Sequence, residues 1–292
     1  MTSHPIPITT AAQITDLARE LRKVDTISFD TEFIRENTFY PVVELLQVAT
    51  ETESWLVDVQ AFRQGRSPRT DALKPLLAVF TDPQILKVLP AAQGDQECLY
   101  TAFEILASPS LDTAVAASLL GYGENIGLGN LTKSVLGIQL KKGHGRTNWS
   151  VRPLPAQLLE YAHGDVTHLV KMGKTLLEKL DQAGRRDWAL QLSREWEDPK
   201  RYENDPEAMA IRLAKGGRMD SRGYAVLNEL VQWRENRVRQ LNLPRRWVAD
   251  DSVLSDLAQV RPKDVDHLGA FRGLNKGEIK NSGTAILEAI RV

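Results

Sequence analysis

Four acidic residues have spacings that would let them act together. Asp30 and Glu32 follow an apolar run, and Asp95 follows a second such run. Asp165 lies four residues after Tyr161. Residues two apart in a strand project from the same face, so Asp30 and Glu32 are expected side by side. Neighbouring buried carboxylates repel each other, and a hard divalent cation prefers oxygen ligands. The pattern therefore predicts a site for Mg²⁺ or Mn²⁺.

Each of these signals has an ordinary structural alternative. A lone aspartate such as Asp95 before a helical run is commonly a cap residue. A solvated edge strand would explain Asp30 and Glu32 if the flanking phenylalanines both faced the core. Tyr161 and Asp165 share one face of a predicted helix, where tyrosines often belong to the core. The combination of all these signals in one α/β region favours a catalytic site over the separate alternatives.

The hydrophobic pattern predicts a mixed α/β arrangement for the first two thirds of the chain. Alternating or β-branched segments indicate strands, and three-four spacing of apolar residues indicates helices. The predicted strands are 26–29, 42–49, 54–57 and 85–89. The predicted helices are 11–22, 71–80, one carrying Asp95 and Leu99, 112–120, 128–136 and 155–180. The short spacing of the first three strands favours an antiparallel start to a mixed sheet.

The chain is predicted to form two domains joined by a linker. Residues 1–195 form the α/β domain, the charged and proline-containing stretch 196–206 forms the linker, and 207–292 forms a small all-α domain with helices at 223–241, 252–259 and 277–290. Of the charged residues, 22 basic and 27 acidic ones precede Glu207, and 15 basic and 11 acidic ones follow from there. The positive charge of the second part is compatible with an anionic partner, although chance variation explains it about as well.

Composition excludes several classes of protein. The chain of 292 residues is 42% hydrophobic and contains one cysteine, Cys98, so an internal disulfide and a two-cysteine zinc site are excluded. The sequence contains neither a signal-peptide pattern nor an apolar run of membrane-spanning length. We therefore expect a cytoplasmic protein with no membrane partner, and a monomer is favoured.

Three short motifs resemble those of the DEDD exonuclease superfamily. Asp30-Thr31-Glu32-Phe33 resembles the first exonuclease motif, Gln93-Gly94-Asp95 the second, and Tyr161-Ala162-His163-Gly164-Asp165 the third. Within the tyrosine-bearing branch the chain is most similar to the ribonuclease D family, and its tail is similar to the helicase and RNase D C-terminal (HRDC) domain. The resemblance implies a ribonuclease H-like mixed sheet flanked by helices, followed by a small all-α HRDC domain.

The resemblance also implies a mechanism. Asp30, Glu32, Asp95 and Asp165 would hold two divalent cations, Mg²⁺ or Mn²⁺, and Tyr161 would orient the attacking water. Asp30 would bridge both ions, and Asp95 would act mainly through water. The implied activity is a 3′→5′ exoribonuclease that releases nucleoside 5′-monophosphates from single-stranded 3′ ends, among which transfer RNA precursors are expected. A DNA exonuclease on the same fold and a non-catalytic RNA-binding protein remain the alternatives.

Several residues outside the acidic set are candidates for binding the substrate. They are Thr31 and Phe33 beside the acidic pair, and Lys141, Arg146 and Trp149 in a basic and aromatic stretch that resembles a lid over RNA. Core packing and an ordinary exposed loop are the respective alternatives. In the tail, five arginines (Arg234, Arg237, Arg239, Arg245 and Arg246) could contact phosphates or form a solvated helix face. His163 is expected to face away from the reaction.

Overall fold

The computed structural model describes residues 6–64, 67–68, 70–141, 147–215 and 219–292. Its contacts divide the chain into two compact units. The first comprises Met1–Ile34 with Pro41–Tyr202, and the second comprises Arg35–Tyr40 with Glu203–Val292. Among the described residues, no helix is both long enough and apolar enough to cross a lipid bilayer.

A five-stranded mixed sheet forms the centre of the first unit. Its strands, in spatial order, are β3 (Ser54–Asp58), β2 (Val42–Ala49), β1 (Thr26–Ile34), β6 (Leu86–Leu89) and β7 (Ser110–Asp112). The first three pair antiparallel, whereas β6 and β7 run parallel to β1. A separate short pair consists of β4 (Arg63–Gln64) and β5 (Ser67–Pro68). Because β1 is central, the solvated-edge explanation of its acidic residues is excluded.

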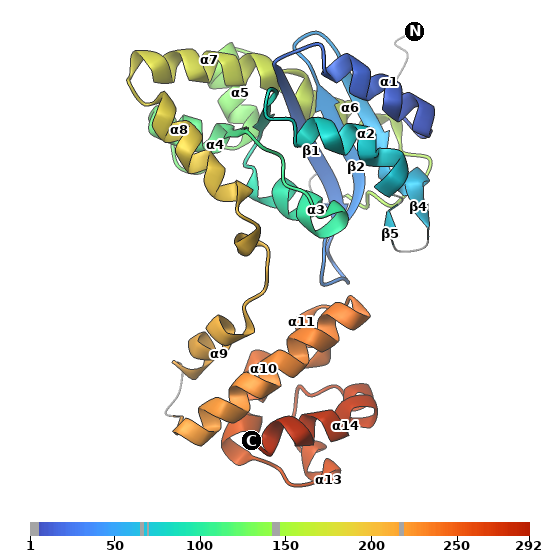
Figure 1. Ribbon diagram of the computed structural model, residues 1–292, viewed down its shortest axis with the longest axis vertical. Coiled ribbons are helices and arrows are strands. Elements are labelled where there is room, and N and C mark those ends of the chain that lie inside the picture. Colours follow the sequence, from blue (N-terminus) through green and yellow to red (C-terminus); the bar gives the residue numbers. More distant parts are fainter. Residues whose placement is uncertain (1–5, 65–66, 69, 142–146, 216–218) are drawn as a thin grey trace. The chain divides into compact units, whose positions relative to one another are not determined.

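Helices cover both faces of this sheet (Figure 1). They are α1 (Ala11–Leu21), α2 (Thr70–Phe80), α3 (Gln93–Phe103), α4 (Thr113–Leu119), α5 (Leu128–Leu136), α6 (Ala156–Thr167), α7 (Leu169–Gln182) and α8 (Arg186–Ser193), with short 3₁₀ turns η1 (Val59–Phe62), η2 (Arg194–Glu197) and η3 (Pro199–Arg201). Helix α1 begins at a capping box in which Thr10 and Gln13 satisfy each other's backbone amides.

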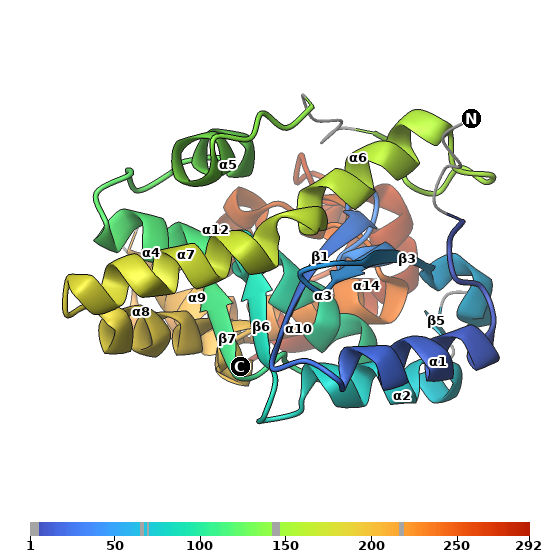
Figure 2. The same ribbon diagram turned by 90° about the horizontal axis from the view of Figure 1, so that it is seen from above.

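The two faces of β1 contact different parts of the first unit. Phe29 points into the apolar cluster shared with α1 and α2, where its ring stacks on Phe80 at 4.7 Å between centroids. The alternate residues face α6 and α7, which lie on the opposite side of the sheet from α1 and α2 (Figure 2). Ser28 shows this directly, because its hydroxyl donates to the Val166 carbonyl of α6 at 3.1 Å. The acid-bearing face of β1 therefore looks toward α6.

The predicted α/β class and mixed sheet are confirmed, with local differences. Strand β1 extends to Ile34, so Asp30 and Glu32 lie inside it and not beyond its end. The single helix expected over 155–180 is two helices, because it is interrupted at His168, which ends α6 and precedes α7. Strand β7 and helix α8 were not predicted. Strand β7 has only three residues, too few to show a period.

The first part of the expected linker over 196–206 is packed in the first unit. Residues through Tyr202 belong to the first unit. Glu197 accepts hydrogen bonds from the Ser110 backbone amide at 2.7 Å and from the hydroxyls of Ser108 and Ser110 at 2.7 and 2.8 Å. Charge and proline content suggested a linker, but Glu197 instead secures the start of β7 through these hydrogen bonds.

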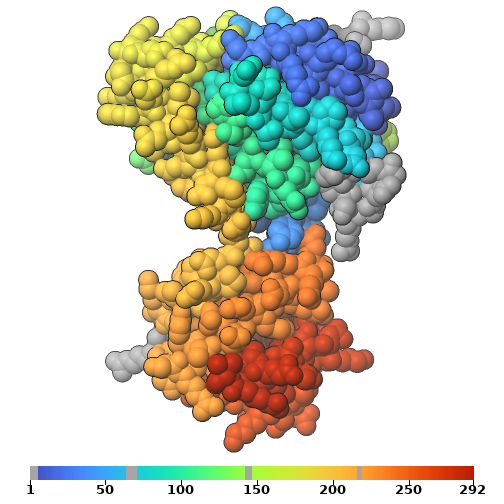
Figure 3. Space-filling view, viewed as in Figure 1, coloured from blue at the N-terminus to red at the C-terminus, as the bar shows by residue number. Residues whose placement is uncertain are grey.

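The second unit is all-α, as predicted. It contains α9 (Pro206–Ala214), α10 (Ser221–Leu241), α11 (Arg245–Val248), α12 (Asp251–Val260), α13 (Val265–Leu268) and α14 (Lys276–Ile290). Leu227, Leu230 and Ile286 belong to its own apolar core, and α14 lies against α10, shown in red and orange in Figure 3. A separate core of this kind is what an independently folding unit requires.

The residues from Arg35 to Tyr40 also pack within the second unit. The backbone amides of Phe39 and Tyr40 both donate to the Asn242 side-chain oxygen, at 3.0 and 3.1 Å. The Arg245 guanidinium lies 4.9 Å from the centroid of the Phe39 ring. Asn242 ends α10 in the left-handed conformation that asparagine tolerates well. The predicted boundaries did not include this segment, because sequence order alone assigns it to the α/β domain.

Candidate active site

The first two acids are placed by the pleat of β1. Asp30 and Glu32 are two residues apart in this strand and share its α6-facing side with Ser28. The pairing with β2 is regular up to Glu32, and the register then shifts between Glu32 and Phe33. This irregularity separates the acid-bearing segment from the remainder of the strand. Bulges of this kind often occur next to active sites, where they redirect a side chain.

Asp95 reaches the same region from a helix. It occupies the first turn of α3, where the positive end of the helix dipole favours a carboxylate. One oxygen of Asp95 accepts from the Thr31 amide at 3.0 Å and from the Thr31 hydroxyl at 2.6 Å. Thr31 therefore holds Asp95 next to Asp30, although the two acids are 65 positions apart in the sequence.

The last two residues come from α6. Tyr161 and Asp165 are one helical turn apart, and a hydrogen bond from the Tyr161 hydroxyl favours the charged form of Asp165. The ring of Trp149 lies 6.1 Å from that of Tyr161, measured between centroids. The hydrogen bond from Ser28 to the Val166 carbonyl then fixes the position of α6 along β1. Three separate elements thus bring the predicted acids to one place.

Crowding and burial change the pKa of every acid in the group. Burial, followed by the charge of Asp30, raises the pKa of Glu32 to about 9. Burial raises the pKa of Asp95 to about 7 and that of Asp165 to about 6. For Asp30, burial and the charges of Asp95 and Asp165 raise the pKa well above its usual range. The pKa of the Tyr161 phenol is raised by burial and by Asp165, so it stays protonated at neutral pH.

The raised pKa values show that the four carboxyl groups resist becoming negatively charged together. An added cation would stabilise all four ionised carboxylates, and their oxygens are the ligand type that Mg²⁺ and Mn²⁺ prefer. Among the described residues, no group of three or more His, Cys, Asp or Glu side chains is already set in metal-binding geometry. One Asp95 oxygen is held by Thr31, and Asp30 and Asp95 share a hydrogen bond. The donor set fits a divalent cation, and loading it would require those carboxyl groups to turn and release protons.

Two of the four acids, Asp30 and Asp165, line a cleft of about 440 Å³. Its wall includes Asp30, Tyr161 and Asp165, and the segment ending at Lys141 lines the other part. A neighbouring hollow of about 310 Å³ shares Tyr161, Asp165 and Lys141 and extends to Glu160. Lys141 is exposed and forms a 2.6 Å ion pair with Glu160. Gln139 and Asn130 also line the cleft and were not predicted, because a single polar residue outside a motif carries no distinguishing pattern.

The candidate substrate-binding residues have different environments. Lys141 borders the cleft, whereas Arg146 lies outside the described residues. Phe33 is partly buried against the core on the α1 and α2 side. Thr31 is buried and donates its hydroxyl to Asp95, so this structure gives it a positioning task. Trp149 is only 2% exposed and packs among apolar residues under α6, so its ring does not present a stacking surface.

A buried ion network holds the chain that enters α6. Arg152 donates to both carboxylate oxygens of Asp58 at 2.8 and 2.7 Å, and also to the carbonyls of Trp149 and Glu44. Glu44 in turn pairs with Arg63 at 2.8 Å. A planar guanidinium suits such multiple contacts. The network ties residues 149–152 to β2 and β3, which explains why Trp149 is buried.

His163 is partly buried and is hydrogen-bonded to the edge of the sheet. Its ring lies 3.0 Å from the Ser54 hydroxyl at the start of β3, and that hydroxyl is also 3.3 Å from Thr167. Burial lowers the pKa of His163, which favours the neutral ring. It lines the smaller hollow but is hydrogen-bonded to the sheet. The geometry gives it a structural role.

Most of the tail arginines are neutralised inside the second unit. Arg234 is fully buried and pairs with Asp251 at 2.6 Å. Arg237 pairs with Glu278 at 2.8 Å, and Arg245 pairs with Glu235 at 2.7 Å. The expectation that these arginines form one phosphate-binding surface is therefore not supported for these three. Helical spacing could not reveal this, because in each of these pairs the acidic partner lies on a different helix from the arginine.

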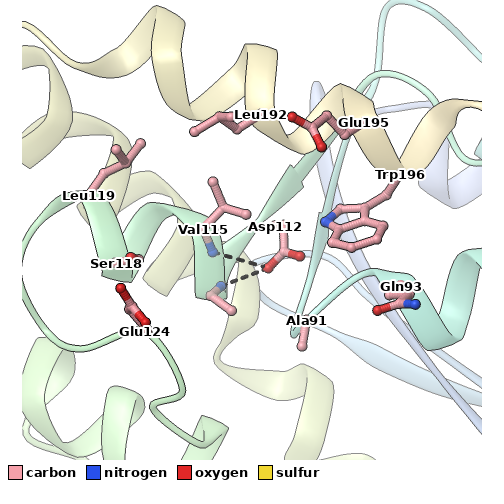
Figure 4. Close-up of a pocket in the computed structure, with 11 residues that line it drawn as sticks. Ala91, Gln93, Asp112, Val115, Ser118, Leu119, Glu124, Leu192, Glu195 and Trp196 are labelled. Carbon is pink, nitrogen blue, oxygen red and sulfur yellow. Dashed lines mark hydrogen bonds between the residues drawn. The ribbon is translucent and has the colours of Figure 1, made fainter. Parts of the chain in front are cut away.

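A further cavity lies away from the acidic cluster. It has a volume of about 370 Å³ and is lined by residues that include Ala91, Asp112, Leu192 and Trp196 (Figure 4). Asp112 accepts hydrogen bonds from the backbone amides of Ala114 and Val115 with one oxygen and from that of Ala92 with the other. Both oxygens are thus used to cap α4 and to hold the loop before α3. Asp112 is thus a structural acid in this fold, with both oxygens engaged by backbone amides.

Comparison with known proteins agrees with this arrangement. The family model for a 3′-5′ exonuclease matches residues 5–181, and that for the HRDC domain matches residues 224–290. Ribonuclease D of Gluconacetobacter diazotrophicus is 37% identical over 98% of this chain and 71% of its own length. Ribonuclease D of Sphingobium indicum is 39% identical over 94% of this chain and 69% of its own length.

A solved structure adds evidence from the fold. Escherichia coli RNase D, described as an exoribonuclease involved in structured RNA processing, matches with a TM-score of 0.89 and 28% identity. The match covers 99% of this chain and 75% of the Escherichia coli chain. The three motif-bearing elements, the family models and the relatives matched over nearly all of this chain agree. The chain belongs to the ribonuclease D family and is a 3′→5′ exoribonuclease.

Proposed function

We propose that Asp30, Glu32, Asp95 and Asp165 hold two divalent cations, Mg²⁺ or Mn²⁺, at the terminal phosphodiester of RNA. The enzyme then releases nucleoside 5′-monophosphates one at a time from a single-stranded 3′ end. The observation that carries this proposal is the convergence of four carboxylates from β1, α3 and α6 into one group whose pKa values are all raised. Such a group is unstable as four anions and is stabilised by cations.

Each residue has a proposed task in this reaction. When bound, paired cations activate the attacking water and stabilise the charge on the departing 3′ oxygen. Asp30 lies between the other acids and is the one proposed to contact both ions. Glu32 and Asp165 would complete one site, and Asp95, one of whose oxygens is held by Thr31, would serve the other. Tyr161 borders the cleft as a protonated phenol, so it orients the water and does not remove its proton.

Replacing Tyr161 by phenylalanine tests this assignment. The ring would remain beside Trp149, while the hydroxyl that orients water and Asp165 would be lost. We expect kcat to fall by less than about 100-fold, the lower end of the roughly 100- to 10,000-fold range for general acid–base catalysis, with little change in KM. Single-turnover assays on a short RNA would measure this. A loss of about 1,000-fold or more would contradict the positioning role and assign the phenol a direct part in proton transfer.

The activity itself is tested with matched RNA and DNA oligonucleotides of one sequence, labelled at the 5′ end. We expect a ladder that shortens from the 3′ end of the RNA in Mg²⁺ and disappears in EDTA. Thin-layer chromatography of 3′-labelled RNA would identify the released product as a nucleoside 5′-monophosphate. Unchanged RNA in Mg²⁺ would defeat the proposal, and faster shortening of DNA would favour the alternative of a DNA exonuclease.

The substrate and setting are also proposals. Escherichia coli RNase D is described as acting in structured RNA processing, and by analogy the precursors of transfer RNA are the proposed substrates here. A cytoplasmic monomer is proposed, and the single cysteine, Cys98, is buried and free of disulfides, as a reducing compartment permits. Lys141, exposed beside the cleft, is the proposed phosphate contact near the 3′ end, together with Arg146. Phe33 and Trp149 support the site through packing.

A further inference from the structure

Gln47 is a buried polar residue whose side chain has no evident structural use. It lies in the middle of β2 and is completely buried. Among the residues that the structure describes, none offers a hydrogen-bond partner to its side-chain nitrogen or oxygen. Buried polar groups are nearly always paired, and leaving one unpaired destabilises the fold. An amide at this position therefore requires an explanation.

The strand register places Gln47 directly beside the acidic cluster. In the antiparallel pairing of β1 with β2, Gln47 is opposite Asp30. Directly opposed residues of antiparallel strands project from the same face, with their Cβ atoms about 4.5–5.5 Å apart. Gln47 thus shares the α6-facing side with Asp30 and lies within reach of its carboxyl group. The same face carries Ser28, whose hydroxyl is bonded to α6 next to Asp165.

The other neighbours of Gln47 on this face are apolar. Leu45 and Ala49 are the residues on either side of it along β2, and Leu56 is opposite it on β3. Leu45 and Leu56 belong to the apolar cluster beneath α6. An apolar side chain at position 47 would extend that cluster without an unpaired amide. Across the strand pair, the polar group that faces Gln47 is Asp30.

A second buried glutamine in the same unit shows what a structural role looks like. Gln96 on α3 is also completely buried. Its side-chain nitrogen donates to the Ala107 carbonyl at 2.8 Å, and its side-chain oxygen accepts from the Ala107 amide at 2.8 Å. Gln96 therefore closes a backbone loop and has both polar atoms paired. Gln47 has the same burial and neither of these bonds.

We propose that Gln47 is a positioning residue for the metal site, whose side-chain nitrogen donates to the Asp30 carboxylate when Asp30 acts as a ligand. This inference rests on the proposed metal-dependent function and extends it to a residue outside the three acidic motifs. Groups that hold ligating carboxylates by hydrogen bonds commonly change metal affinity 10- to 100-fold when removed. The Gln47 amide is thus used when metal is bound, although its unpaired polar atoms destabilise the metal-free protein.

The experiment compares Gln47→Met with Gln96→Met. Methionine has a similar volume and an unbranched chain, but lacks an amide. In EDTA, Gln47→Met should have a melting temperature equal to or above that of the wild type, because an unpaired amide is removed. Gln96→Met should melt several degrees lower, because two hydrogen bonds are lost. For Mn²⁺, measured by calorimetric titration without RNA, Gln47→Met should raise the dissociation constant about tenfold, and Gln96→Met should leave it unchanged.

Three other results would overturn the inference about Gln47, and one of them would also overturn the proposed function. Wild-type affinity for Mn²⁺ in Gln47→Met would overturn the inference while leaving the proposed metal site intact. A melting temperature in EDTA that falls as far as in Gln96→Met would also overturn it, because Gln47 would then be an ordinary structural residue. If the wild-type protein itself bound no Mn²⁺, the proposed metal-dependent function would fail and this inference with it.

Discussion

Replacing Asp30 by asparagine should lower kcat on single-stranded RNA at least about 100- to 1,000-fold, by analogy with the loss of one group that stabilises a transition state. Asp30 is the acid that interacts with the other members of the cluster: its pKa is raised by burial and then by the charges of Asp95 and Asp165, and it shares a hydrogen bond with Asp95. Asparagine keeps the shape but removes the negative charge that two cations would share. Single-turnover kinetics at saturating Mg²⁺ would measure the loss.

A matched control comes from the other cavity of the same unit. Glu124 is exposed and lines the pocket beside Asp112, outside the acidic cluster. Glu124→Gln removes the same unit of charge, and we expect its kcat to remain within about twofold of the wild type, as for a surface substitution away from the site. Wild-type activity in both Asp30→Asn and Glu124→Gln would show that Asp30 is not part of the reaction. Equal losses in both would indicate a general electrostatic effect on RNA binding.

Replacing Glu32 by glutamine should inactivate the enzyme yet stabilise the metal-free protein at alkaline pH. Burial and the charge of Asp30 raise the pKa of Glu32 to about 9, so the folded protein holds this proton more tightly than the unfolded chain does. The associated stability is present below about pH 4.5 and is lost as the pH rises toward 9. At pH 8.5 in EDTA, we expect Glu32→Gln to be more stable than the wild type by about 2 kcal/mol.

Urea unfolding at pH 5 and pH 8.5 would test the sign of this effect. The difference between the two proteins should be larger at pH 8.5, and Mg²⁺ should reduce it by stabilising the wild type alone. Glu44→Gln is the control, because Glu44 is buried in β2 but paired with Arg63 at 2.8 Å. It should destabilise the protein by about 3 kcal/mol. A wild type that is more stable than Glu32→Gln at pH 8.5 in EDTA would contradict the raised pKa.

Local patterns in the sequence were sufficient for most of the fold. Strand 42–49 and helix 128–136 occur as predicted, because a run of apolar residues and a regular three-four spacing each specify one element. The helix expected over 155–180 was too long. The apolar periodicity continues through His168, although the helix itself is interrupted there. Strand β7 has three residues and lies in the sheet only because β6 pairs with it. Its formation depends on a tertiary contact that no local pattern records.

The sequence by itself determined the chemistry: which acids are present, that Asp30 and Glu32 share a strand face, and that Tyr161 and Asp165 share a helix face. Those statements follow from the periods of strands and helices, which are local. The tertiary structure alone decided that Thr31 holds Asp95, that Trp149 is buried, and that Arg234 and Arg237 are neutralised by acids distant in sequence. It also placed the unpaired Gln47 opposite Asp30. Strand register, burial and the choice of ion-pair partner depend on how separate elements pack, and local spacing cannot encode that.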